Sequence, residues 1–203
     1  MTLGEYLNES SLLLTSASQV WSESLVSAAL KAITVALRSG KPLLVCGNGG
    51  SAADALHVTG ELVGRFLLER RALNVICLSS NIAVLTAMAN DSGFETVFSR
   101  QVEAYGQPGA VLIGISTSGN SRNVVNAFEQ ARFMGMTTIA LTGESGGKLA
   151  GLSDHLFAVP SRSTPLIQQA HTCLYHYLCR EIEAELASDS PRQLHIGSSV
   201  FAG

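Results

Sequence analysis

The sequence is poor in charge, and the charge that it has is not gathered into clusters. Charged residues make up 14% of the 203 positions, and Asp and Glu outnumber Lys and Arg by 16 to 13. A protein that binds nucleic acid through its phosphates needs a concentration of positive charge. The absence of a basic cluster therefore argues against nucleic acid as a partner.

The sequence also lacks long apolar runs and paired cysteines. The run Val111–Ile115 is far too short to cross a bilayer, and the N-terminus has no basic start followed by an apolar core, as a secretion signal would have. Cys46, Cys77, Cys173 and Cys179 show no metal-binding or redox spacing, and we expect them to be small buried residues of a reducing compartment. We therefore expect a cytoplasmic protein with no membrane partner.

Apolar residues are abundant, at 46% of the chain, which is enough for one sizeable core. Beyond residue 41, short apolar runs alternate with segments of helical periodicity. This alternation is typical of a parallel sheet that is covered by helices on both faces. We expect an α/β fold with a doubly wound, flavodoxin-like sheet of five strands. The expected strands are Leu43–Cys46, Leu73–Leu78, Ala110–Ile115, Thr137–Leu141 and His155–Val159.

The chain divides into three expected parts. Residues 1–40 predict two amphipathic helices that belong to the same unit; they could cover the sheet or pack on a partner chain, and we favour a subunit contact. Residues 41–187 form the α/β domain, and residues 188–203, rich in Ser and Gly, predict a loose tail. The expected helices are Met1–Thr15, Trp21–Arg38, one from Ala52, Val84–Ala89, Phe94–Tyr105, Val124–Met134, Lys148–Leu152 and Leu166–Leu186.

A glycine-rich turn, Gly47–Ser51, separates the first expected strand from a helix. Such a turn is a general anion receptor, because bare N–H groups and the positive end of the helix point into one spot. Gly47 to Ala52 also fits a variant of the dinucleotide fingerprint, but the second strand ends without the acidic residue that would hold a ribose. We therefore favour anion binding over a nicotinamide cofactor and over a turn with no ligand.

A second loop, Ser116–Ser121, offers four hydroxyls and backbone donors at a helix start. These groups suit a phosphate monoester when no Lys or Arg is at hand. An ordinary capping turn needs only one hydroxyl, so four hydroxyls favour a ligand site. Ligands bind at the carboxyl ends of parallel strands, and we expect both loops at that edge of the sheet.

Two helices carry residues that could ligate a metal or transfer protons. His57 and Glu61 are four apart and share a helix face, so they could chelate a metal, act as acid and base, or simply pair on an exposed surface. The last helix offers Gln168, His171 and His176. Helix geometry alone would pair Gln168 with its neighbour His171, because His176 lies about 12 Å from Gln168 along the axis. Either histidine could instead be a buried residue with a hydrogen-bond partner, and spacing does not decide between them.

Motifs spread over nearly all of Met1–Ala187 occur in the same order in one known family. They are Cys46–Ser51, His57, Glu61, Ala89–Asp91, Phe98–Arg100, Ile115–Ser121, Leu141–Gly143, Gly146–Leu149, Ile167–Gln168, His171 and His176. On these motifs the chain resembles the sedoheptulose 7-phosphate isomerases, or phosphoheptose isomerases, of the sugar isomerase (SIS) domain family. The resemblance implies a SIS-type domain, a homotetramer with active sites at subunit interfaces, and conversion of sedoheptulose 7-phosphate to D-glycero-D-manno-heptose 7-phosphate. That reaction is the first step towards bacterial heptose precursors, such as those of the lipopolysaccharide core.

The resemblance also implies roles for individual residues. Those that would bind the phosphate are Ser51, Ser116, Thr117, Ser118 and Ser121. Those that would bind the sugar are Asn48, Gly49, Gly50, Glu61, Asn90, Asp91 and Gln168. Glu61 and His176 would be the catalytic acid/base pair, which selects His176 over His171. The ligands of one zinc ion per subunit would be His57, Glu61, Gln168 and His176.

The sequence departs from the family pattern in two places. Gly60 directly precedes Glu61, where a glycine costs about 1 kcal/mol of helix stability relative to Ala, and Pro165-Leu166 stands where the family commonly has a polar or acidic residue and Arg. The rival interpretation is a non-catalytic SIS protein that binds a sugar phosphate or the bacterial replication initiator protein. A relative of the latter kind lacks the Glu at the position of Glu61, so the presence of Glu61 with both histidines favours an enzyme.

Overall fold

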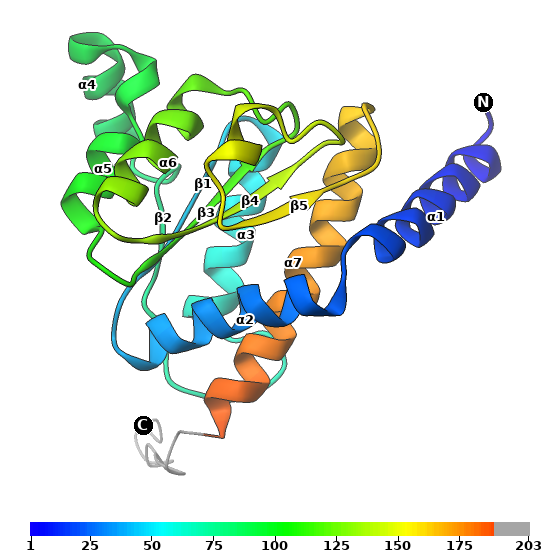
Figure 1. Cartoon of the computed structure of the whole chain (residues 1–203), viewed down its shortest axis with the longest axis horizontal. Helices are drawn as coiled ribbons and strands as arrows, with labels where there is room; N and C mark the ends of the chain where they lie inside the picture. Colours follow the sequence, from blue (N-terminus) through cyan, green and yellow to red (C-terminus); the bar gives the residue numbers. More distant parts are fainter. Residues whose placement is uncertain (189–203) are drawn as a thin grey trace, which may run out of the picture.

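The computed structural model describes residues 1–188 and shows a five-stranded sheet with helices on both faces (Figure 1). The strands are β1 Leu43–Gly47, β2 Val75–Cys77, β3 Val111–Ser116, β4 Thr137–Thr142 and β5 His155–Ala158. Every pairing is parallel, and the order is β2-β1-β3-β4-β5. This is the flavodoxin-like order, so the predicted doubly wound fold is confirmed. The tail predicted over residues 188–203 lies, apart from Ser188, outside the described residues.

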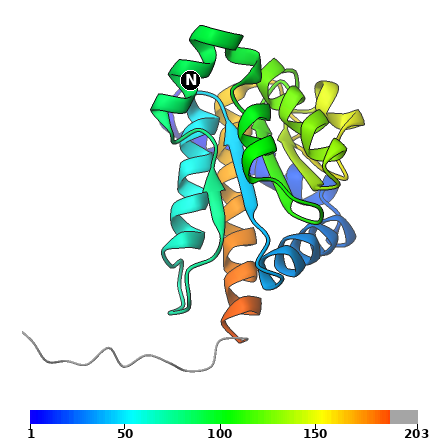
Figure 2. The ribbon, with the colours of Figure 1, turned by 90° about the vertical axis from the view of Figure 1, so that its left-hand side faces the viewer.

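The helices divide between the two faces of the sheet because successive strand residues point in opposite directions. Leu43 and Val45 pack with α2, α3 and α7 in one core cluster, whereas Leu44 and Cys46 pack with α5 and α6 in the other. The helices are α1 Leu3–Val20, α2 Glu23–Arg38, α3 Gly50–Val63, α4 Ile82–Ser92, α5 Ser99–Tyr105, α6 Arg122–Phe133 and α7 Thr164–Ala187, with the 3-10 helices η1 Phe94–Thr96 and η2 Gly147–Gly151. Figure 2 shows α3 and α7 side by side on one face of the sheet.

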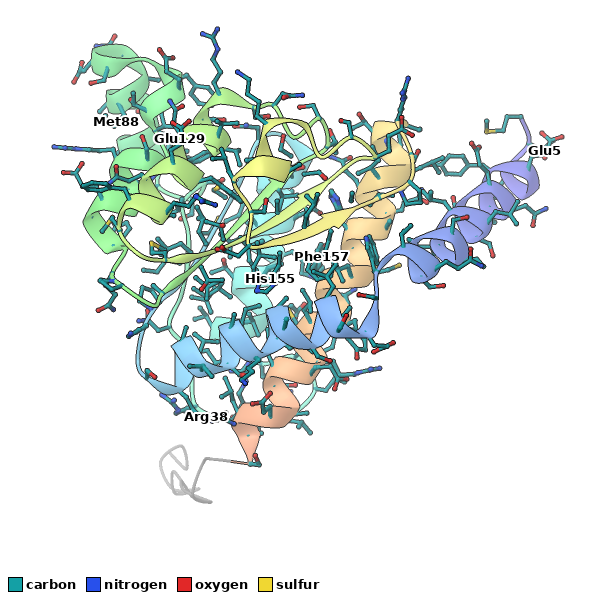
Figure 3. The ribbon with its side chains drawn as sticks, viewed as in Figure 1. Glu5, Arg38, Met88, Glu129, His155 and Phe157 are labelled. Carbon is teal, nitrogen blue, oxygen red and sulfur yellow. The ribbon has the colours of Figure 1, made fainter. Side chains whose placement is uncertain are left out.

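The N-terminal helices α1 and α2 differ in how they meet the rest of the molecule. α2 packs on the core along its length, whereas only the second half of α1 packs on the molecule, through Leu13, Leu14 and the buried Ala17. The first half of α1 extends away, with Glu5 near its far end (Figures 1 and 3). Trp21, at the bend between them, donates a 3.0 Å hydrogen bond to the carbonyl of Ala158 and packs edge-on against Phe157. Phe157 points from β5 towards α2 and α7 (Figure 3). The predicted helical pair is present, and α1 is longer than predicted.

No single helix within residues 1–188 has both the length and the apolar composition to span a membrane. Only α1 and α2 taken together reach that length and composition, and they are bent by 80°.

Several predicted boundaries and one predicted burial are wrong. The helix expected to break at Asn90 continues to Ser92, because the residue that ends it is Gly93, whose φ of 90° favours glycine. The helix expected over residues 94–105 is divided into η1 and α5, and the strand expected over residues 73–78 shortens to β2. Cys173 is exposed on the outer face of α7, whereas the other three cysteines are buried as predicted.

Candidate active site

The two predicted anion-binding loops meet where the sheet order changes direction. β1 and β3 are neighbours, and the connections that follow them leave to opposite sides, which is the usual ligand position of this fold. The side-chain amides of Asn48 and Asn123 exchange two hydrogen bonds, each 2.9 Å, and so join the first loop to the start of α6. Asn123 is buried and was not among the predicted site residues, because nothing in its local sequence marks it as a partner of Asn48.

The glycine turn leads into α3 without a side-chain cap. Gly49, the N-cap residue, has a φ of +55°, and no side chain hydrogen-bonds to the first turn there. Ser51 is buried in that first turn. A Cβ on Gly50 would collide with the side-chain amide of Gln168, so the bare α-carbon lets α7 approach the loop closely. The N-terminal N–H groups of α3 are therefore placed to meet an anion.

The serine loop is held by its own hydroxyls and by the loop after β4. Ser116 and Ser121 lie 3.0 Å apart between their Oγ atoms, and Ser118 Oγ accepts from the N–H of Asn120. Gly119, at a φ of +65°, packs against Gly146 so closely that a Cβ would overlap its carbonyl. Ser121 is the N-cap residue of α6 but makes no capping hydrogen bond. An ordinary capping turn thus does not describe this loop.

His57, Glu61 and His176 come together between α3 and α7. His57 Nε2 lies 3.0 Å from Glu61 Oε1 and 3.4 Å from His176 Nε2, and the three ligand atoms lie within 4.8 Å of one another. Two imidazole nitrogens and a carboxylate oxygen at this spacing could hold a metal ion. The same groups could take up and release protons. The ring of Phe66 stacks on His176 at a centroid distance of 5.7 Å and closes one side of the cluster.

Gln168 and His171 lie elsewhere on α7. Gln168 is beside Gly50, two turns from His176, so the described chain brings together three of the four residues predicted to bind metal. His171 is fully buried and hydrogen-bonds through Nε2 to the carbonyl of Thr142 at 3.1 Å. Burial lowers its pKa to about 4, although the bond to Thr142 acts in the opposite direction. The pairing of Gln168 with His171, suggested by spacing, therefore does not form a site.

Asn90 and Asp91 lie in the last turn of α4, a helix without buried residues that stands at the edge of the molecule (Figure 1). Both side chains are exposed, and the amide of Asn90 donates a 2.8 Å hydrogen bond to Asp91 Oδ1. In the described chain this bond joins the two residues to each other, and not to the glycine turn or the serine loop.

Two residues that were not predicted as site residues, Asp54 and Tyr175, lie on the side of His57 that faces away from Glu61. The hydroxyl of Tyr175 lies 3.0 Å from His57 Nδ1 and 3.4 Å from Asp54 Oδ1. Burial raises the pKa of Asp54, against the hydrogen bond from Tyr175 and the charge of His57, which lower it. Asp54 could have been found from the sequence, because it stands three residues before His57 on the same helix face.

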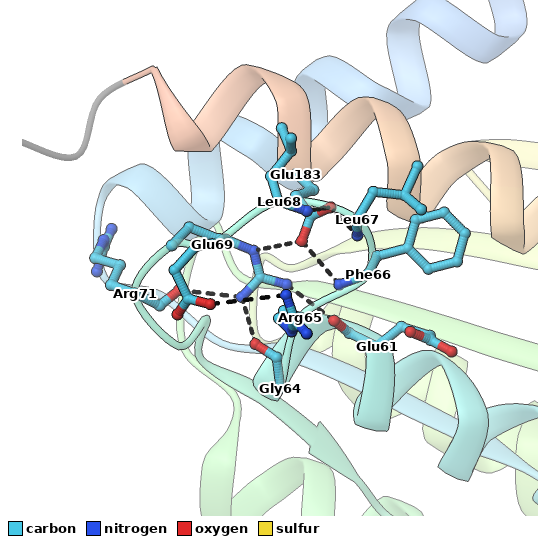
Figure 4. A network of polar contacts seen from close by, with 10 residues as sticks. Glu61, Gly64, Arg65, Phe66, Leu67, Leu68, Glu69, Arg71 and Glu183 are labelled. Carbon is cyan, nitrogen blue, oxygen red and sulfur yellow. Dashed lines mark hydrogen bonds and ion pairs between the residues drawn. The ribbon is translucent and has the colours of Figure 1, made fainter. Parts of the chain in front are cut away.

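A buried ion pair fixes the chain that follows α3 (Figure 4). Glu183 on α7 accepts hydrogen bonds of 2.5 to 2.8 Å from the backbone N–H groups of residues 66–68 and pairs with Arg70 at 3.3 Å. Arg70 in turn donates to the carbonyl of Glu61 at 2.9 Å. These contacts fix the loop over residues 64–70 to both the end of α3 and α7. Phe66 belongs to this loop, so they also hold its ring against His176.

Comparison with known proteins places these features in a family. The sequence model of the SIS domain matches residues 5–143. A phosphoheptose isomerase from Crocosphaera subtropica is 52% identical over 149 residues, which are 73% of this chain and 76% of that protein. The structure of a phosphoheptose isomerase from Francisella tularensis superimposes with a TM-score of 0.86 at 36% identity, covering 91% of this chain and 100% of that one. The structure of the phosphoheptose isomerase from Neisseria gonorrhoeae superimposes with a TM-score of 0.84 at 39% identity, covering 90% of this chain and 97% of that one.

Proposed function

The chain belongs to the SIS domain family and, within it, to the phosphoheptose isomerases, and on this premise we propose that it converts sedoheptulose 7-phosphate to D-glycero-D-manno-heptose 7-phosphate. The observation that carries the proposal is the meeting of Glu61 with two histidines beside two loops suited to phosphate. The chain is thus a sugar-phosphate isomerase, and its substrate is a small molecule.

The phosphate of the substrate would bind to the two loops. The N-cap side chains of α3 and α6 make no hydrogen bond to the first turn of their helices, which leaves N–H groups there for an anion, and the N-terminal ends of helices are positive. The hydroxyls assigned to the phosphate are those of Ser51, Ser116, Thr117, Ser118 and Ser121. The residues assigned to the sugar are Asn48, Gly49, Gly50, Glu61, Asn90, Asp91 and Gln168.

The isomerisation needs only proton transfers. A proton leaves C1 of the ketose and one is added at C2, while the hydroxyl proton of O1 is lost and O2 gains one, through an enediol. We assign Glu61 as the base that takes and returns the carbon-bound proton, and His176 as the acid that exchanges protons with the sugar oxygens. The ring of Phe66 against His176 limits the positions that the imidazole can adopt.

We assign zinc to the cluster of His57, Glu61 and His176, whose nitrogen and oxygen donors suit that ion. When bound, the ion would polarise the carbonyl and hydroxyl oxygens of the sugar. Gln168 is a proposed fourth ligand on the resemblance alone, because in the described chain it lies beside Gly50.

We also propose a cytoplasmic homotetramer with active sites at subunit interfaces, working in the supply of heptose for the lipopolysaccharide core. The exposed apolar side chains of α1 support an assembly, since Leu3, Leu7 and Leu12 are 57 to 73% exposed.

The deciding experiment is turnover of sedoheptulose 7-phosphate in deuterated water, for the wild type, Glu61→Gln and the control Glu69→Gln, at equal metal occupancy. Glu69 is 87% exposed and belongs to no part of the site. We expect the wild type and the control to form product with deuterium at the carbon next to the carbonyl, and Glu61→Gln to lose both. Wild-type turnover by Glu61→Gln would refute the assigned base. Tight binding without turnover in the wild type would support a non-catalytic sugar-phosphate sensor or interaction protein instead.

A further inference from the structure

A line of three polar side chains runs from the interior to the metal-binding cluster. Asp54 and His57 lie on α3, and Tyr175 reaches them from α7. The phenol oxygen is 3.4 Å from Asp54 Oδ1 on one side and 3.0 Å from His57 Nδ1 on the other. Tyr175 is 4% exposed, so water does not compete freely for its hydroxyl.

The direction of these hydrogen bonds follows from the number of protons available. An ionised carboxylate only accepts, so the single hydroxyl proton of Tyr175 is donated to Asp54. The phenol oxygen then accepts from His57, which places a proton on Nδ1. With Nδ1 protonated, the lone pair of Nε2 can take a metal ion, whereas without the ion Glu61, 3.0 Å from Nε2, competes for the ring proton. Tyr175 and Asp54 therefore favour the metal-binding tautomer against Glu61.

Asp54 has a feature that folding alone does not explain. Its second carboxylate oxygen, Oδ2, is buried and has no hydrogen-bond partner within residues 1–188. An unsatisfied buried acceptor is destabilising, because it has given up its hydrogen bonds to water without a replacement. An apolar residue at this position would give a more stable protein than a carboxylate with an unsatisfied oxygen. The presence of the carboxylate is better explained by an effect on the proton position of the neighbouring imidazole.

We propose that Asp54 and Tyr175 are positioning residues, which hold His57 in the tautomer whose Nε2 can bind a metal ion. The inference rests on the metal site assigned under the proposed function. Partners behind a ligating histidine fix its tautomer and orientation, and their loss lowers metal affinity about 10- to 100-fold. Asp54 acts here mainly through the hydroxyl of Tyr175, beside a direct electrostatic attraction to His57.

The test is the affinity of purified metal-free protein for Zn²⁺, measured by competition with a chelating dye. The variants are Tyr175→Phe, Asp54→Asn, the double variant and the control Tyr177→Phe, which removes a hydroxyl from a more exposed position of α7. We expect a loss of about 10- to 100-fold for Tyr175→Phe, a smaller loss for Asp54→Asn, and no change for the control. The double variant should lose less than the product of the two single losses, because the carboxylate acts on His57 mainly through the hydroxyl. Zn²⁺ affinities within twofold of the wild type, or losses that multiply in the double variant, would overturn the proposal.

A second measurement separates this inference from the metal site itself. ¹⁵N NMR of the metal-free protein at pH 8 should show a larger fraction of His57 protonated at Nδ1 in the wild type than in Tyr175→Phe, because the phenol oxygen and Glu61 compete for the ring proton. A wild type that binds no Zn²⁺ but shows this change would refute the zinc assignment and leave the positioning role standing. Equal fractions of the two tautomers in the wild type and Tyr175→Phe would refute the positioning role, whatever the metal affinity.

Discussion

At the scale of single residues, the buried His171 makes the unfolding free energy of the protein depend on pH. Its pKa is lowered by burial to about 4, whereas an unfolded chain has an ordinary histidine pKa near 6.5. Between these two pH values the unfolded state therefore binds more protons than the folded state. The contribution of neutral His171 to the unfolding free energy is complete above pH 6.5 and is lost as the pH falls towards 4. We expect the wild type to lose about 2 kcal/mol of unfolding free energy between pH 7.5 and pH 5 through this residue. His171→Gln keeps a donor for Thr142 but does not titrate, so urea unfolding of this variant should show a correspondingly flatter pH dependence. An unchanged slope would contradict the prediction.

Gly119 provides a second test at this scale. Gly119→Ala would combine a φ of +65° with an overlap between the new Cβ and the carbonyl of Gly146. Gly40→Ala is a matched control, because its φ is +73° and nothing lies within 4 Å of the Cβ position. We expect the control to lose about 1 kcal/mol from backbone strain and Gly119→Ala to lose more. Calorimetric titration with a sugar phosphate should show weakened binding for Gly119→Ala alone, and equal effects of both variants would argue against a closely packed serine loop.

Contacts within the site could be predicted from the sequence only between residues that lie on the same helix or loop. His57 and Glu61 are four apart on one helix, so their meeting needs no tertiary information. The choice between His171 and His176 depends on which side of α7 faces the sheet, and local spacing does not contain that fact. For the same reason Tyr175 and Asn123 were missed, because each contacts a residue that is distant in the sequence.

At the scale of elements, Glu183 and Arg70 hold the loop after α3 in place. Burial raises the pKa of Glu183, but the three backbone donors and Arg70 outweigh it, so the pKa is lowered overall. Glu183→Gln removes the charge from a buried pair and should destabilise the protein by about 3 to 5 kcal/mol. The control Glu185→Gln breaks an exposed pair with Arg38 and should change stability by less than about 1 kcal/mol. Chemical denaturation of both variants at pH 7 checks this, and similar losses would contradict it.

The same carboxylate predicts a pH effect in the acid range. Because its folded-state pKa is lowered, its stabilising contribution is present above the unfolded-state value of about 4.3 and is lost as the pH falls through the folded-state pKa. Wild-type unfolding free energy should therefore drop more steeply below about pH 4.3 than that of Glu183→Gln. Parallel curves for the two proteins would be evidence against this contribution.

Elements were easier to predict than their ends. β1 and β3 are continuous apolar runs because both of their faces are covered, and such runs stand out in the sequence. The end of α4 was misplaced because Asn90, Asp91 and Ser92 are typical of turns, although the helix ends where the backbone needs glycine, at Gly93. Local composition indicates that a helix ends nearby, and the backbone conformation decides at which residue.

At the scale of the whole molecule, α1 is the part least explained by one subunit. Its capping box at Thr2 and Glu5 stabilises a helix that buries little within the chain. If α1 packs in the proposed homotetramer, Leu12→Glu should place a charge in an apolar contact and shift the assembly to smaller species in light scattering. Gln19→Glu changes the charge of an exposed residue on the same helix and should leave the assembly intact. A Leu12→Glu protein that keeps the wild-type mass would contradict a role of α1 in assembly.

The pairing of α3 with α7 also has a consequence for the order in which the protein becomes active. His57 and His176 are 119 positions apart in the chain, and so they are made at very different times. As the ribosome delivers the chain, α3 and the five strands emerge before α7, so α3 can pack on β1 and β2 while the side that meets α7 stays uncovered. The three residues proposed to bind the metal therefore meet only after α7 has been made and has docked on α3.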